Sequence, residues 1–130
     1  MRLEIKALPS EAFSLNSRCH WSEKRKATQE ALLLVREALG APPWTQYAKA
    51  KARVLIVVAT RRRRDGDNFS GRLKPFWDAL EKWGIIEEDD LEHLRVESLD
   101  IEVDPARAPL TVIELDDKGE KWESIQLRQS

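Results

Sequence analysis

The chain has 130 residues, the usual size of one domain, with room for one modest hydrophobic core. Its 22 basic and 23 acidic residues give a net charge of -1, so a nucleic acid or an anionic membrane would need a local patch to bind. One cysteine, Cys19, excludes an intrachain disulfide and a four-cysteine zinc site. With no signal peptide and no apolar run near the ~20 residues of a membrane span, we expect a soluble cytoplasmic domain without a membrane partner.

The first half of the chain predicts a strand, a helix and a second strand. Residues 1–7 alternate apolar and charged side chains, which is typical of a strand with one buried face. A helix is expected from Ser22, as its cap, to Gly40. Its apolar face would consist of Ala27, Ala31, Leu34, Val35 and Ala38. Residues 54–59 are β-branched and almost uninterrupted, which predicts a strand buried on both faces in the middle of a sheet.

The second half predicts one helix and two strands. Apolar residues recur at helical spacing from Phe69 to Leu80, and Pro75 belongs in a first turn, so the helix should start near Leu73, after a loop at residues 66–72. Gly84 is a good left-handed terminator. Residues 94–103 change phase near Ser98, which predicts a strand with a bulge, and residues 110–115 form a further strand.

The fold class follows from this order of elements. Strand, helix, strand, helix, strand, strand predicts a single α+β (mixed α/β) domain, in which two helices pack on a mixed sheet. We place this domain at residues 1–116. The C-terminal tail, 117–130, is polar except for three residues, and would be an extra strand, a dimer contact or a disordered segment.

Two aspartates follow the buried strand directly. Asp65 and Asp67 stand on a loop at a strand end, where active sites collect, and both carboxylates could face one point. A hard cation such as Mg²⁺ needs one or two carboxylates of this kind. The alternative is an ordinary turn, since Asp, Gly and Asn all favour turns. An EF-hand loop does not fit, because Phe76 stands where the bidentate glutamate is required.

Charged residues surround these aspartates on both sides in sequence. The acidic run from Glu87 to Asp90 is by default a solvated surface, and Lys74 and Asp78 share one helix face, either as a surface pair or with a role. Basic residues that hold phosphate beside acids that hold a metal are what phosphodiester cleavage requires. The basic run is Arg61, Arg62, Arg63 and Arg64.

Taken together, these motifs resemble the RusA family of Holliday junction resolvases. The resemblance rests on Arg-Asp-x-Asp-Asn at residues 64–68, a lysine four residues before Asp-Ala-Leu, and Gly-Ile-Ile before a run of acids. A weaker match covers Leu8-Pro9 and residues 14–21. It implies a RusA-like fold and a homodimeric, Mg²⁺-dependent endonuclease that cuts four-way DNA junctions, with Mn²⁺ as the alternative metal. Such a protein would work in DNA recombination and repair in the cytoplasm, with a nucleoid-associated or a phage-encoded protein as the alternatives.

The resemblance also implies roles for single residues. Asp65, Asp67 and Asp89 would hold the metal, with Asp90 as the alternate to Asp89, and Lys74 would complete the catalytic set. Asn68 would support them, and Asp78 would either support them or have a structural role. Backbone contacts to DNA would come from the four arginines together with Arg18 and Lys24. His20 and Trp21 are candidates for stacking on a base, with a core position as the alternative for Trp21.

One departure and three rival functions accompany the resemblance. The interval from Asp65 to Lys74 is about three residues longer than in the family, and Ser70, Gly71 and Arg72 are the extra residues. A non-catalytic domain that binds branched DNA would keep the scaffold without turnover. A flap or fork nuclease would use the same site on other substrates. A structural interaction module would use the charges only as surface ion pairs.

Overall fold

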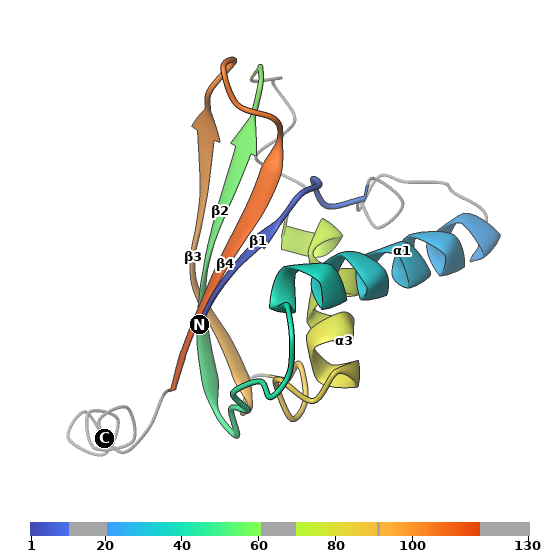
Figure 1. Cartoon of the computed structure of the whole chain (residues 1–130), viewed down its shortest axis with the longest axis vertical. Coiled ribbons are helices and arrows are strands. Elements are labelled where there is room, and N and C mark those ends of the chain that lie inside the picture. Colours follow the sequence, from blue (N-terminus) through green and yellow to red (C-terminus); the bar gives the residue numbers. More distant parts are fainter. Residues whose placement is uncertain (11–20, 61–69, 91, 118–130) are drawn as a thin grey trace.

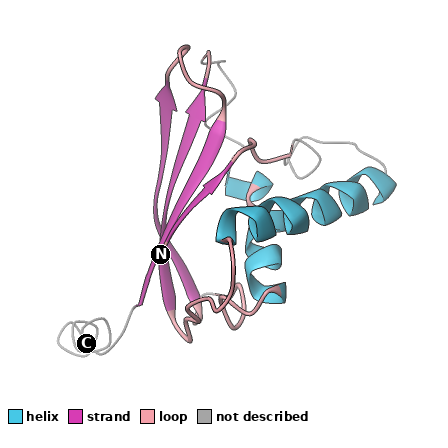
Figure 2. Ribbon diagram, in the orientation of Figure 1, coloured by secondary structure: helices cyan, strands magenta, loops and turns pink. Residues whose placement is uncertain are grey.

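The computed structural model describes residues 1–10, 21–60, 70–90 and 92–117. These form a small single-domain α+β fold with a mixed four-stranded sheet and two helices, as the sequence predicted. The elements are β1 (Arg2–Ile5), α1 (Trp21–Leu39), β2 (Ala50–Val58), α3 (Lys74–Lys82), β3 (Leu94–Val103) and β4 (Leu110–Asp117). Both helices lie on the same side of the sheet (Figure 2).

The sheet has the order β1-β4-β2-β3, so β2 is an interior strand. It runs parallel to β3 and antiparallel to β4. The prediction of a strand buried on both faces holds for part of β2 only, because Ile56 and Val57 on opposite faces are both 0% exposed, whereas Leu55, on the same face as Val57, is half-buried. The strand starts at Ala50 rather than at Val54. Ala50 and Ala52 both lie in the core, although alanine has little strand preference and gave no signal in the sequence.

The bulge predicted near Ser98 is present in β3. Val96 pairs with Ala52 and Ser98 pairs with Arg53, so Glu97 is the extra residue. An extra residue reverses the alternation of side chains, and it thereby returns Leu94 and Leu99 to the same face of the sheet. Both contact the hydrophobic core.

Three element boundaries differ from the predictions. β1 ends at Ile5 rather than at residue 7, because the Ala7 N–H donates to the Ile5 carbonyl at 2.8 Å and turns the chain. The helix α1 begins at Trp21, so Ser22 lies within its first turn and does not cap it. β4 continues beyond the predicted residue 115 to Asp117.

The buried face of α1 agrees with the prediction. Ala27, Ala31 and Val35 are buried, and Gly40 ends the helix with a φ of 73°. α1 packs against α3 and β1, and the Trp83 indole nitrogen donates to the Leu32 carbonyl at 2.9 Å across the two helices.

The start and end of α3 also agree with the prediction. Leu73 is the residue before its first turn, Pro75 lies in that turn, and Gly84 has a φ of 79° just after its end. Residues 70–72 were expected to be loop, and this was wrong, because they form a helical turn directly before Leu73. Arg72 lies in that turn and is buried, which explains why these residues form a turn of helix rather than a loop.

The parallel strands β2 and β3 end at the same edge of the sheet, and the segment that carries Asp89 precedes the opposite end, where Leu94 pairs with Ala50. β2 and β3 both end at the upper edge in Figure 1, where the strands extend past the helices. Neither described helix is both long and apolar enough to cross a membrane.

Candidate active site

Lys74 lies between two carboxylates at the start of α3. Its ammonium group contacts Asp78 Oδ1 at 3.0 Å, one helical turn further along, and it donates a short hydrogen bond to Asp89 Oδ2. Asp89 belongs to the segment after Gly84, fifteen residues away in sequence. The fold therefore brings together a lysine and two aspartates that the sequence had singled out.

The two carboxylates keep Lys74 charged. The hydrogen bond that Lys74 donates to Asp89 raises the pKa of Lys74 above its ordinary value, and Asp78 acts in the same direction, although partial burial opposes both. Lys74 is therefore an ammonium group at neutral pH. Half of its side chain is exposed, so this group is open to a phosphate from solvent.

Asp89 and Asp90 point in different directions, which separates the two residues that the acidic run left as alternates. Asp89 contacts Lys74, and its side chain is 22% exposed. Asp90 Oδ1 instead accepts the backbone N–H groups of Glu92 and His93, both at 3.0 Å, and lies 2.7 Å from Nδ1 of the His93 ring. In this structure only Asp89 of the pair shares a site with Lys74.

A second cluster lies on the Asp90 side of the same segment. Glu88, Asp90 and His93 each offer a ligand atom, and these atoms lie within 4.8 Å of one another. The hydrogen bond to Asp90 raises the pKa of His93, and the same contact lowers the pKa of Asp90. Because Glu88 faces the Asp90 carboxylate, its pKa is raised. One imidazole with two carboxylates suits Mn²⁺ or Zn²⁺ better than Mg²⁺.

The resemblance implies a metal held by three aspartates, and one of them is described. Asp89 offers hard carboxylate oxygens, half-buried and beside a cation, and this donor type suits Mg²⁺. Asp65, Asp67 and Asn68 lie outside the described residues, and so do Arg18 and the four arginines at residues 61–64.

The remaining candidates lie on α1. Lys24 is exposed near the start of the helix, next to the exposed side chains of Arg25 and Lys26. Trp21 is 64% exposed, so the alternative of a core position for it was wrong. An aromatic ring beside three basic side chains is compatible with contact to a nucleic acid.

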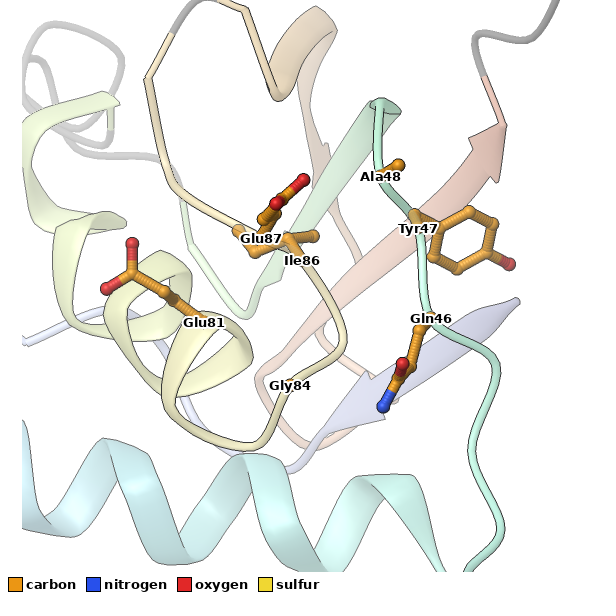
Figure 3. Close-up of a pocket in the computed structure, with 7 residues that line it drawn as sticks. All are labelled: Gln46, Tyr47, Ala48, Glu81, Gly84, Ile86 and Glu87. Atoms are coloured by element: carbon orange, nitrogen blue, oxygen red, sulfur yellow. The ribbon is translucent and has the colours of Figure 1, made fainter.

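A pocket of about 510 Å³ lies next to this segment but does not contain the lysine–aspartate cluster. It is lined by residues 46–48 and by Glu81, Gly84, Ile86 and Glu87. Figure 3 shows that the Tyr47 ring points away from the two glutamates. Since its only charged lining groups are carboxylates, this pocket does not suit a phosphate.

Two residues of the region were missed in the sequence. The Asp90–His93 spacing of three residues is a signal that could have identified His93. Arg72 gave no such signal, because its partner is a backbone carbonyl 63 residues away. No protein-family model and no curated protein sequence matches the chain.

Proposed function

We propose that this protein is a Mg²⁺-dependent endonuclease that acts on branched DNA and resolves four-way junctions by hydrolysis of phosphodiester bonds. The contact between Lys74 and Asp89 carries the proposal. The motif resemblance assigns these two residues to one catalytic site. Their distance in sequence gives no local reason for them to meet.

The charge of Lys74 defines what it would do. An ammonium group whose pKa is raised is a poor general base, so Lys74 would contribute positive charge rather than accept a proton. A fixed cation beside the scissile phosphate stabilises the negative charge that develops on the phosphoryl oxygens as water attacks.

Asp89 would serve the metal together with Asp65 and Asp67. Mg²⁺ bound by such carboxylates supplies Lewis acidity and lowers the pKa of a coordinated water. In the described structure Asp89 neutralises Lys74, and Asp78 supplies a second negative charge to the same ammonium group. Asp78 would hold Lys74 in place while Asp89 serves as a ligand.

Two copies of this chain in a two-fold dimer would present two such sites. A four-way junction has two equivalent strands to cut, so a symmetric dimer matches the symmetry of its substrate. The basic side chains at the start of α1, together with the arginines at residues 61–64, would contact the phosphate backbone.

The test is a cleavage assay with the purified full chain. The substrates are a synthetic four-way junction, a fork, a flap and a linear duplex, each in Mg²⁺, Mn²⁺ and EDTA. The variants are Asp67→Asn and Lys74→Met, with Lys82→Met on the same helix as the matched control. We expect paired nicks in the junction that require metal, persist in the control and disappear in both variants.

Other results would select a rival function. Metal-independent binding of the junction without nicks would identify a binding domain that lacks turnover. Cleavage of the flap or fork in preference to the junction would change the substrate but keep the site. Absence of both binding and cleavage would identify the charges as surface ion pairs of an interaction module.

A further inference from the structure

Arg72 is the only charged residue that is buried among those the structure describes, with a relative exposure of 9%. A charge taken out of water is costly unless hydrogen bonds replace its hydration. Its Nε and Nη2 atoms both donate to the carbonyl oxygen of Pro9, at 3.1 and 2.5 Å. The planar guanidinium thus clamps one oxygen with two parallel donors, a geometry that lysine cannot reproduce.

This clamp joins two parts of the chain that are distant in sequence. Pro9 follows the first strand, and Arg72 ends the helical turn that precedes α3, 63 residues later. The next residue, Leu73, is 2% exposed, and its carbonyl accepts the N–H groups of Phe76 and Trp77 at 2.9 and 3.2 Å. Arg72 and Leu73 therefore anchor the chain to the rest of the fold, and Lys74 is the next residue.

The start of α3 depends on these anchors. No side chain caps this helix, so its first turn lacks the support that usually fixes a helix start. The direction of the backbone at Lys74 is instead set by the Leu73 side chain in the core and by the Arg72 clamp.

The clamp lies within the segment where this chain departs from the family that it resembles. Ser70, Gly71 and Arg72 are the extra residues before Lys74, and they form an ordered turn whose last member is the buried arginine. We propose that Arg72 is a positioning residue, which holds the start of α3 so that Lys74 meets Asp89. The inference concerns the geometry of Lys74, and its consequence for cleavage rests on the proposed function.

A purely structural role makes a different prediction. An arginine that only stabilises the fold would, when replaced, lower the stability and leave Lys74 unchanged in the folded molecules. A positioning residue changes the contact between Lys74 and Asp89 within the folded protein. The NMR chemical shifts of the Lys74 side chain at one fixed pH report that contact, because its ammonium group donates a hydrogen bond to Asp89.

The experiment compares Arg72→Gln and Arg72→Lys with Arg107→Gln in the full chain. Arg107 is an exposed arginine in the turn before β4, so it controls for the loss of one charge. Two quantities are measured: the NMR chemical shifts of the Lys74 side chain at one fixed pH, and the single-turnover rate of junction cleavage at saturating protein, with the junction Kd.

In Arg72→Gln we expect the chemical shifts of the Lys74 side chain to move toward those of an unpaired lysine. Cleavage should be slower by ten-fold or more, since a misplacement of about 1 Å can reduce the rate by about 10²-fold. The Kd should be unchanged, because Lys74 contributes one phosphate contact among many. Arg72→Lys should be intermediate, and Arg107→Gln should match the wild type in both quantities.

Two outcomes separate this inference from the proposed function. If the Lys74 chemical shifts and the cleavage rate stay at wild-type values in folded Arg72→Gln, the positioning role is wrong although the nuclease stands. If the wild type cuts no substrate but Arg72→Gln still changes the Lys74 chemical shifts, the positioning role stands and the nuclease is wrong. Should Arg72→Gln not fold, Arg72→Lys decides by the same two criteria.

Discussion

Lys74 and Asp89 form an ion pair between the first turn of α3 and the segment that follows Gly84, and the Lys74 ammonium group also contacts Asp78. Exposed pairs contribute only about 0–1 kcal/mol to stability, so the fold gains little from this one. The cluster of Lys74, Asp78 and Asp89 is built from two separate segments and contributes little to stability. We therefore expect it to have a catalytic role.

Replacing Asp89 and Asp90 in turn tests which acid serves the site. Asp89→Asn should reduce junction cleavage by about 10²-fold or more, because it removes a charged group from the centre where charge develops. Asp90→Asn should leave cleavage near the wild-type rate, since its side chain faces His93 instead. The measurement is the single-turnover rate of each variant, with circular dichroism to show that both fold.

The opposite order of effects would reassign the site. If Asp90→Asn abolished cleavage and Asp89→Asn did not, the catalytic acid would belong to the cluster of Glu88, Asp90 and His93. The metal preference should then shift from Mg²⁺ toward Mn²⁺ or Zn²⁺, because that cluster contains an imidazole.

A buried leucine of α3 and an exposed leucine of α1 test whether the face of α3 packs as described. Leu80 is 0% exposed in the core, and Leu80→Ala should lower the free energy of unfolding by about 2–5 kcal/mol. Leu33→Ala is the matched control, because Leu33 is 69% exposed, and its effect should stay within about 0.5 kcal/mol. Urea denaturation measures both. Equal effects would mean that the α3 face is not packed as described.

Much of the fold could be predicted because its signals are local. The alternation in β1, the bulge in β3 and the left-handed Gly84 each depend on residues within one short window. The order of the strands, with β4 between β1 and β2, depends on pairings across most of the chain, which no local pattern encodes. The helical turn at residues 70–72 was missed for the same reason, because the buried arginine in it is held by Pro9.

The same distinction between local signals and distant contacts applies to the candidate site. The spacing of Lys74 and Asp78 places them on one helix face, so their ion pair could be predicted. The pairing of Lys74 with Asp89 came from the motif resemblance rather than from spacing. The choice between Asp89 and Asp90 needed the structure, because neighbouring residues of a charged run are equivalent until the backbone sets their directions.

Gly84 allows a direct test of the turn that carries the chain from α3 toward Asp89. Its φ of 79° is strained for a residue with a Cβ, so Gly84→Ala should reduce stability by about 1–2 kcal/mol. A Cβ there would lie 3.6 Å from the Gln46 amide nitrogen, an ordinary contact, so the cost comes from the backbone and not from a clash. Gly84→Asn should be less harmful, since asparagine tolerates this conformation better. Thermal unfolding measures the ranking, and equal losses for both variants would indicate a steric cause.

The contact between His93 and Asp90 should make stability depend on pH in a defined window. The pKa of His93 is raised by Asp90, so its stabilisation is fully present below the unfolded value of about 6.5 and is lost as the pH rises through the higher folded pKa. The pKa of Asp90 is lowered, so its stabilisation is present above about 3.9 and is lost as the pH falls through the lower folded value. Glu87 and Glu88 also face the ring and add to the first effect.

The difference in Tm between wild type and His93→Gln should therefore be largest between about pH 4 and 6.5. Asp90→Asn keeps an oxygen for the two backbone N–H groups but loses the charge, so it should show the same profile, and the double variant should add nothing further. A Tm difference that stays constant from pH 4 to 9 would show that the two side chains do not interact in solution.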